Sequence, residues 1–250
     1  MDWSKAKNIL ILIFIVLNVF LLAYSGIYTK NSNISKEALI STLNVLKKNG
    51  IVIDPMCNIP AYNKKIPMLM LESENNLTLT ENSSFSYNDS NPAKYIDINN
   101  IKSIEKHSRD YLATLDKKIS NFILDKYVKN PDETVTLVFT EKYKGFLVFD
   151  NKISVNVSKN GIENIASNIK KIKGFTKTPS VIMPAHQVLL KNFYNKKNMT
   201  IKSIDIGFKG FGSGEDEQES REAFQGPAWR ITTDDEREIF LKAYDGEEIE

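Results

Sequence analysis

The feature that most constrains this chain is an apolar stretch close to its start. Every residue from Ile9 to Leu22 is apolar except Asn18. The apolar character continues as far as Tyr28 when Tyr24 and Tyr28 are counted as aromatic residues of a membrane interface. About 20 such residues suffice for a membrane-spanning helix. We therefore predict that this stretch crosses a membrane once.

A cleaved signal peptide is the alternative interpretation. Lys5 and Lys7 would supply its positive start, and Ala23-Tyr24-Ser25 would supply its cleavage motif. We favour retention, because Tyr and Ser are poorer than Ala in that motif and the apolar stretch continues beyond it. The Leu, Ile, Val and Phe residues favour insertion by roughly −4 to −8 kcal/mol, which outweighs Asn18 even at the +3 kcal/mol of a charge. Because the two lysines precede the span, we predict a cytoplasmic amino terminus and an extracytoplasmic remainder.

These predictions divide the chain into a short cytoplasmic tail, a transmembrane helix, a linker and two extracytoplasmic domains. The predicted boundaries are residues 1–8, 9–28, 29–34, 35–175 and 176–250. Charged residues make up 26% of the chain and hydrophobic residues 42%, which is ordinary for folded protein. Cys57 is the only cysteine, so an internal disulfide is impossible.

Charge is distributed unevenly along the sequence. Residues 211–250 hold 13 acidic and 4 basic residues, although the whole chain has a formal net charge of +2. The basic remainder has no cluster in which cations alternate with aromatic residues, so we predict no nucleic-acid partner.

The predicted extracytoplasmic part alternates helical and strand patterns. Apolar residues at helical spacing follow Ser35 and end at Asn49-Gly50, and a strand at 51–53 comes directly after. The stretch MLMLESENNLTLTENSSFSY indicates two short strands around Asn75-Asn76. This pattern predicts a first unit of one helix and a small sheet.

Two more units of the same kind follow. An apolar stripe that runs on to Ile119, Phe122 and Ile123 predicts a helix over 103–124, before Pro131. Strong strand patterns then meet at predicted turns, at Lys144-Gly145 and Asn160-Gly161.

The third helix is predicted to start at Pro184, and three strands follow it. The fold class predicted is α+β, a transmembrane helix followed by helix-plus-antiparallel-sheet units, with each helix packed across a small sheet.

Side chains that often carry chemistry stand apart from one another. His107 and His186 lie on separate predicted helices, and neither has a second His or a Cys at metal-binding spacing. The stretch GFGSGEDE at 210–217 is rich in glycine, but its acidic residues would repel a phosphate, and its spacing does not match a calcium-binding loop. Asp234-Asp235 is placed in a turn between strands. We predict no catalytic, cofactor-binding or metal site.

Asn18 is a polar amide inside a predicted membrane span. It is either a tolerated polar residue or the donor and acceptor of a contact with a second membrane helix, since an amide in hydrocarbon has no water to bond. By helical spacing its face holds the predicted partner-binding set, which is Phe14, Leu17, Asn18, Leu21 and Leu22. At the other end of the chain, Trp229 is predicted to lie in the structural core.

Both ends of the sequence resemble one family. The opening Asp2-Trp3-Ser4-Lys5-Ala6-Lys7, followed by an apolar span with Asn18 in it, is similar to YycI (WalI) proteins. The ending, PAWRI and then IFLKAYDGEEIE, resembles the last two strands of the same family and, more broadly, PepSY-type domains. The middle of the chain carries no motif of the family, and the acidic loop and tail depart from its pattern.

The resemblance implies a non-catalytic regulator anchored in the cell membrane of a Gram-positive bacterium. YycI proteins act with a companion, YycH, on the sensor histidine kinase WalK (YycG) of a two-component system, through transmembrane and external contacts, and adjust control of cell-wall metabolism. The expected partners are therefore a WalK-like kinase, a YycH-like protein and the membrane. A different class, suggested by the PepSY-like ending, is an inhibitor or chaperone of an external protease or hydrolase.

Overall fold

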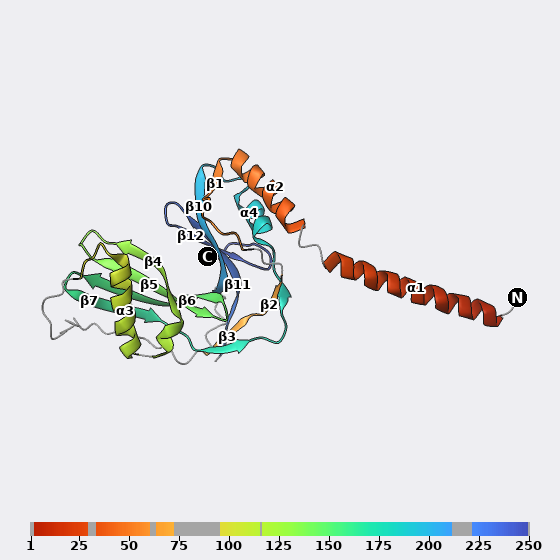
Figure 1. Ribbon diagram of the computed structural model, residues 1–250, viewed down its shortest axis with the longest axis horizontal. Helices are drawn as coiled ribbons and strands as arrows, with labels where there is room; N and C mark the ends of the chain where they lie inside the picture. The colour runs from red at the N-terminus through yellow and green to blue at the C-terminus, as the bar shows by residue number, and fades with distance from the viewer. Residues whose placement is uncertain are drawn as a thin grey trace.

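The computed structural model describes residues 3–29, 34–60, 64–72, 96–115, 117–211 and 222–249, with the exception of some side chains near the ends of the first two helices. Helices and one large sheet make up this part of the chain, as the α+β prediction requires (Figure 1). The helices are α1 (Trp3–Thr29), α2 (Ile34–Lys48), α3 (Ile101–Leu115), the 3-10 helix η1 (Lys117–Asn121) and α4 (Ala185–Phe193).

The strands fall into a ten-stranded sheet and a separate two-stranded ribbon of β2 and β9. In chain order they are β1 (Ile51–Ile53), β2 (Lys65–Ile66), β3 (Leu69–Glu72), β4 (Phe122–Lys129), β5 (Val135–Tyr143), β6 (Phe146–Ser158), β7 (Gly161–Asn168), β8 (Ile172–Phe175), β9 (Ser180–Val181), β10 (Met199–Lys209), β11 (Glu222–Thr233) and β12 (Glu238–Lys242).

Helix α1 is an uninterrupted helix of 27 residues that projects away from the rest of the molecule (Figure 1). The described side chains from Leu10 to Leu21 are all exposed. None of the described helices meets the length and hydropathy expected of a membrane span.

One hydrophobic core lies between helices α2 and α4 and the sheet strands nearest them. Leu46 of α2, Val188 and Phe193 of α4, and Ile204 and Trp229 of the sheet are buried together there. Helix α2 and strand β1 occur where the sequence predicted them. Strand β1 does not join a local antiparallel meander. It pairs in parallel with β10, nearly 150 residues later, with Ile51 opposite Met199.

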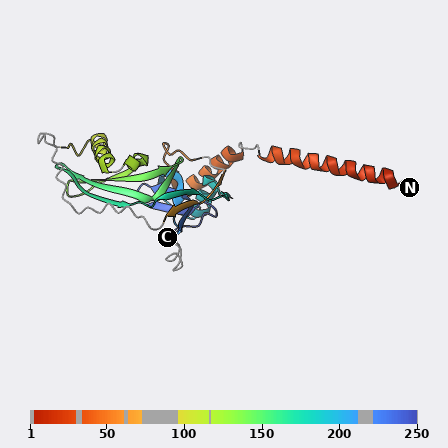
Figure 2. The same cartoon turned by 90° about the horizontal axis from the view of Figure 1, so that it is seen from below.

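A second core lies under α3, which covers one face of strands β4 to β7 (Figure 2). Ile104 and Leu112 of α3 pack there against Phe139, Ile153 and Val155 of the sheet. The turns predicted at Lys144-Gly145 and Asn160-Gly161 connect β5 to β6 and β6 to β7.

The helix predicted over 103–124 is wrong in its second half. Helix α3 ends at Leu115, and β4 begins at Phe122. Ile119 and Phe122 are both buried in the second core, although Ile119 lies in the 3-10 helix η1 and Phe122 in strand β4, so their spacing fits a helical stripe that one continuous α-helix does not form. Pairing with the Val-rich strand β5 is what makes Phe122 and Ile123 part of a strand.

Strand β6 belongs to both cores. Its first residues pair in parallel with β10, at Leu147 opposite Gly207, while its second half pairs with β5 and β7. Val148 lies in the first core and Ile153 in the second. The predicted division at residues 175 and 176 remains a prediction, and strands from both sides of it pair within the one sheet.

Candidate functional site

The predicted contact face of α1 is exposed where its side chains are described. The exposed fraction is 64% for Phe14, 51% for Leu17 and 53% for Leu21, and the side chain of Leu22 lies outside the described part of the structure. The amide nitrogen Nδ2 of Asn18 donates a hydrogen bond of 2.8 Å to the carbonyl oxygen of Phe14, one turn earlier. One amide hydrogen is thus bonded within the helix, and Asn18, which is exposed, retains its side-chain oxygen as an acceptor.

Trp229, the predicted core residue, is fully buried in the first core. Its indole nitrogen donates a hydrogen bond of 3.0 Å to the carbonyl oxygen of Met183, just before α4. The ring therefore has apolar neighbours and a satisfied polar atom, which suits a buried tryptophan.

The other side chains singled out in the sequence do not meet in one place. His107 lies on α3 and His186 on α4, and burial lowers the pKa of His186. Asp235 accepts hydrogen bonds from Thr233 and Arg237 within its own turn. Residues 212–217 of the glycine-rich acidic stretch lie outside the described residues. Across the described residues no three His, Cys, Asp or Glu side chains are grouped as a metal site would require.

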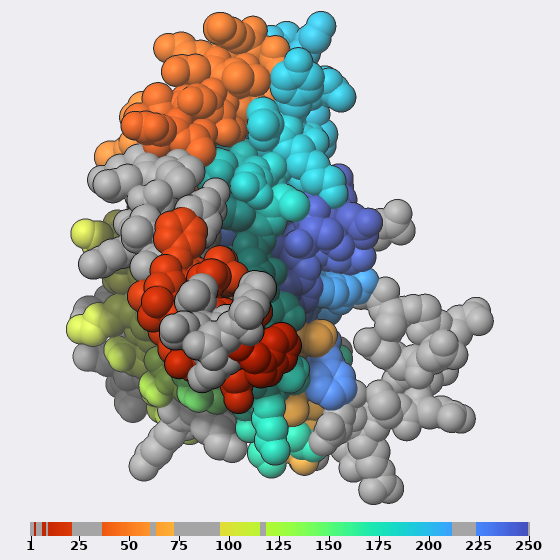
Figure 3. Space-filling view, turned by 90° about the vertical axis from the view of Figure 1, so that its right-hand side faces the viewer, coloured from red at the N-terminus to blue at the C-terminus, as the bar shows by residue number. Residues whose placement is uncertain are grey.

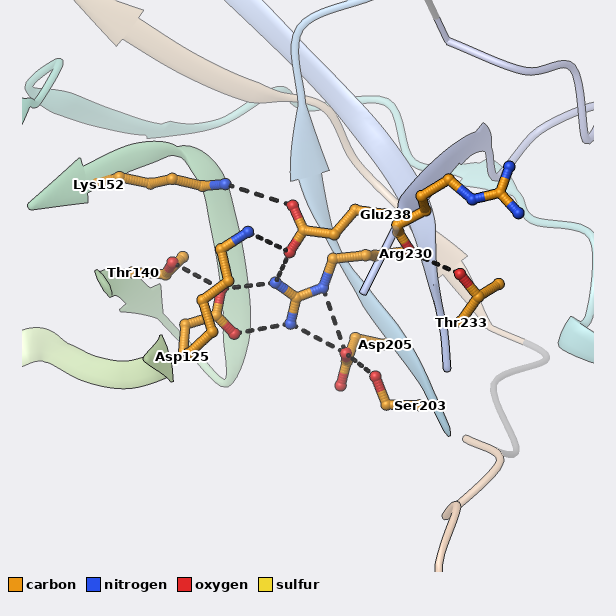
Figure 4. A network of polar contacts seen from close by, with 10 residues as sticks. Asp125, Thr140, Lys152, Ser203, Asp205, Arg230, Thr233 and Glu238 are labelled. Atoms are coloured by element: carbon orange, nitrogen blue, oxygen red, sulfur yellow. Dashed lines mark hydrogen bonds and ion pairs between the residues drawn. The ribbon is translucent and has the colours of Figure 1, made fainter. Parts of the chain in front are cut away.

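The structure instead brings together a buried ionic cluster that the sequence did not reveal (Figure 4). Its centre is Arg230 of β11, whose side chain is 6% exposed. The guanidinium forms two hydrogen bonds with Asp125 of β4, of 2.5 Å from Nη1 and 2.7 Å from Nη2. It also donates from Nη2 to Asp205 of β10 at 3.0 Å and lies 3.4 Å from Glu238 of β12. One arginine therefore joins carboxylates from three other strands.

A second layer of polar groups surrounds these carboxylates. Thr140 donates a hydrogen bond of 2.9 Å to Asp125. Lys126 and Lys152 lie 3.4 Å and 3.8 Å from the carboxylate oxygens of Glu238. The three cations and three carboxylates thus balance in charge, which the deeply buried pair of Arg230 and Asp125 at the centre requires.

Local irregularities of the strands put these groups in place. Asp125 is the extra residue of a β-bulge, since Leu124 and Lys126 pair with the neighbouring residues Phe139 and Val138. Such bulges redirect a side chain. Arg230 is directly opposite Asp205 across the β10–β11 pair, and strand alternation turns it away from the side on which Trp229 is buried.

A larger irregularity in β6 lies beside the cluster. Glu141 pairs with Val148 and Thr140 pairs with Lys152, so residues 149–151 have no partner in β5. The side chains of all three make other contacts. The Phe149 ring centroid lies 5.0 Å from the guanidinium of Arg230. The other contacts in this set are those of Asp150 with Lys209, Gly210 and Gln225, and those of Asn151 with Glu141 and Lys170.

The protonation states follow from this arrangement. Burial by itself would raise the pKa of Asp125, but the hydrogen bonds and charge of Arg230 outweigh it and hold that pKa below its ordinary value. Burial would lower the pKa of Arg230, yet Asp125 and Asp205 raise it. Burial lowers the pKa of Lys152 despite the attraction of Glu238, and burial raises the pKa of Glu141 despite its bond to Asn151. Arg230 and Asp125 are therefore held in their charged forms at the centre of the cluster, where they link β11 of the first core to β4 of the second.

Sequence reasoning missed this cluster for two reasons. Asp125 and Arg230 are 105 residues apart, and the segment around Asp125 was assigned to a helix. One signal was present, because Arg230 interrupts an apolar strand, between Trp229 and Ile231. A cation at that position has to be buried and paired.

The comparison with protein families decides the identity. Residues 29–244 match the profile of the YycI protein family. The chain belongs to the YycI family. This confirms the family that the two ends suggested, and the matched range covers the middle of the chain, where no motif had been visible; the opening residues and the apolar stretch precede that range. Family membership indicates a regulatory role in the YycG/WalK system, and YycI proteins form a regulatory family rather than an enzyme family.

Comparisons with curated proteins and with solved structures complete this picture. No curated protein matches it. Among solved structures, the YpeB C-terminal domain from Bacillus megaterium aligns with a TM-score of 0.43 at 11% identity, over 62% of this chain and 64% of that one. An uncharacterized protein from Eubacterium rectale aligns with a TM-score of 0.40 at 12% identity, over 60% of this chain and 55% of that one.

Proposed function

We propose that this protein is a membrane-anchored, non-catalytic regulator of a WalK/YycG-type sensor histidine kinase that acts together with a YycH-like partner. The match of residues 29–244 to the YycI family carries this proposal. In it, residues 9–28 form a single transmembrane helix with a cytoplasmic amino terminus, and the domains after the linker lie outside the cytoplasm, where they tune signalling that controls cell-wall metabolism.

The properties of α1 support a contact inside the membrane. Its exposed apolar side chains need a non-aqueous neighbour, and Asn18 presents a side-chain oxygen on the face of Phe14 and Leu17. Anchoring beside a membrane kinase confines the two proteins to a surface, so a weak contact is strengthened by a high effective concentration.

The test is association with the kinase and the YycH-like partner in membranes, measured by site-specific crosslinking with the amount of each protein checked by blotting. Asn18→Leu removes the amide and makes the helix more apolar, so membrane insertion should be retained. Association should fall by about 3- to 30-fold, because an interhelical hydrogen bond of this kind is worth about 0.6–2 kcal/mol.

A matched pair of variants separates the predicted face from its flank. Phe14 and Ile13 are adjacent and similarly exposed, at 64% and 62%. Phe14→Ala should weaken association more than Ile13→Ala. Full association and full regulation with Asn18→Leu would contradict the contact, and recovery of an external hydrolase in place of a kinase would favour the inhibitor class.

A further inference from the structure

Two segments of the chain combine lysines with a complete lack of acidic residues. Residues 164–204 contain eight lysines and no Asp or Glu, and residues 55–71 contain two lysines and no Asp or Glu. The two segments meet in the β2–β9 ribbon, where Lys65 pairs with Val181 and Ile66 with Ser180. The ribbon is fixed to the first core by Ile66, which is buried.

The ribbon lies at the end of the molecule from which α1 departs (Figure 1). Helices α2 and α4 contact each other, and their carboxyl ends meet where Asn49 donates a hydrogen bond of 2.6 Å to the carbonyl oxygen of Tyr194. Strand β9 ends at Val181, and α4 begins at Ala185, so the ribbon lies close to the start of α4.

The distance between this end and α1 is limited by the chain itself. Helix α1 ends at Thr29 and α2 begins at Ile34. An extended chain covers at most about 3.6 Å per residue, so the start of α2 lies within about 18 Å of the end of α1. Figure 3 looks onto this end, with α1 toward the viewer and the orange atoms of α2 and the teal atoms that lead into α4 around it.

The exposed groups of the ribbon suit a negatively charged surface. Lys64, Lys65 and Lys177 are exposed, and Val181 beside them is 64% exposed. Glu37, in the first turn of α2, is an acidic residue at the same end.

The acidic turn near the carboxyl terminus contacts a different part of α4. Lys191 donates a hydrogen bond of 2.7 Å to the carbonyl oxygen of Asp245, and Asn192 donates one of 2.9 Å to that of Gly246. These contacts involve the second half of α4, and the same carboxyl-terminal segment reaches the residues just before α4, where Ala243 accepts a hydrogen bond of 2.7 Å from the backbone of Met183.

We propose that the β2–β9 ribbon docks on the outer surface of the membrane, where Lys64, Lys65 and Lys177 bind anionic phospholipid headgroups and Val181 enters the interface. This inference rests on the proposed membrane anchor, which holds the ribbon close to the bilayer. Each lysine near an anionic surface shifts the balance toward docking by about fivefold. Docking would fix the orientation of the external domains relative to α1, and so relative to any kinase or partner beside it.

The experiment uses the full chain in nanodiscs of phosphatidylcholine alone or with phosphatidylglycerol. An environment-sensitive NBD fluorophore is attached at Val181→Cys in a Cys57→Ser background. In anionic nanodiscs the emission should shift to the blue, lipids brominated near the headgroup should quench it, and raised salt should reverse both effects. Replacing Lys64, Lys65 and Lys177 together with Gln should lower the ratio of docked to undocked protein by about 100-fold.

The matched control changes the same number of charges at the far ends of the two helices. Lys47, Lys196 and Lys197 are exposed there, and replacing them together with Gln should leave the NBD signal at residue 181 unchanged. Equal emission in both lipid compositions, or equal effects of the two triple variants, would overturn the docking while leaving the anchor intact. Failure of the protein to remain in either nanodisc would overturn the anchor and the docking together.

Discussion

Replacing Arg230 with methionine should remove a large share of the stability of this protein. The substitution keeps most of the side-chain length but leaves Asp125, whose side chain is 6% exposed, without its cation. The carboxyl group would then have to be protonated in the folded state. For an ordinary Asp pKa of about 3.9, protonation at pH 7 costs roughly 4 kcal/mol. That figure agrees with the loss of about 3–5 kcal/mol found when one partner of a buried ion pair is removed, against a total stability of about 5–15 kcal/mol for a typical domain.

The assay is urea unfolding of the full chain in mild detergent, followed by circular dichroism, and a double-mutant cycle gives the sharper test. The variant Asp125→Leu/Arg230→Met removes both charges, so its loss should be smaller than the sum of the two single losses by about 1–3 kcal/mol. The loss caused by Arg230→Met should also shrink as the pH falls. The pKa of Asp125 is lowered in the folded state, so its contribution is present above the ordinary pKa and disappears as the pH falls through the folded one.

A second arginine seven residues later serves as the control. Arg237 forms an ion pair of 2.5 Å with Asp235, but the two side chains are 68% and 49% exposed. Exposed pairs contribute little to stability, so Arg237→Met should leave the urea midpoint nearly unchanged. Strictly additive losses in the Asp125/Arg230 cycle, or equal losses for Arg230→Met and Arg237→Met, would refute the interpretation of the cluster as a buried joint.

Three further changes test other parts of the fold by thermal unfolding. Because burial raises the pKa of Glu141, its ionised form is unfavourable in the folded state, so Glu141→Gln should raise the melting temperature at pH 7 and lose that advantage below about pH 4. Trp229→Ala should cost about 3–5 kcal/mol, while Trp229→Phe, which keeps a ring but loses the bond to Met183, should cost less; an unchanged melting curve for Trp229→Ala would rule out its place in the core. In Gly207→Ala the new methyl group would overlap the carbonyl oxygen of Leu147, so we expect a loss of about 1–3 kcal/mol or more, and a neutral effect would contradict the close pairing of β10 with β6.

Local patterns in the sequence were sufficient for most of the helices and strands. Helices α2 and α4, strand β1 and the turns of β5, β6 and β7 each depend on neighbouring residues, such as the apolar spacing around Leu46 or the Asn160-Gly161 pair. The error at β4 has the same origin. Ile119 and Phe122 happen to be three residues apart, and only pairing with the next strand, β5, makes Phe122 part of a strand, while Ile119 stays in η1.

Long-range pairing explains what could not be predicted. No local signal places β1 beside β10, because the two strands lie nearly 150 residues apart in the sequence. The same is true of Asp125 and Arg230, which meet through a bulge in one strand and a cross-strand position in another. Burial of Trp229 followed from its type and its strand, whereas the burial of Arg230, the next residue, depended on partners that the sequence did not identify.

The joint between the two cores is ionic, and this affects the relative orientation of the cores more than their stability. An apolar contact of the same volume could hold the cores together as firmly, since a buried ion pair is often no more stabilising than well-packed hydrophobic side chains. Such an apolar contact would, however, allow more than one relative orientation of the two cores. The planar guanidinium of Arg230 meets Asp125 through two parallel hydrogen bonds and Asp205 through a third, and this geometry permits one relative orientation of the strands that carry them.

In the function proposed here, α1 and the β2–β9 ribbon act at one end of the molecule while the α3-covered core lies at the other. A joint with a fixed direction would present both ends to membrane partners as one rigid surface, and a variant such as Asp125→Leu/Arg230→Met, tested under conditions in which it stays folded, should bind the membrane normally and regulate the kinase poorly. Normal regulation by that variant would show that the orientation of the two cores is not what the kinase system senses.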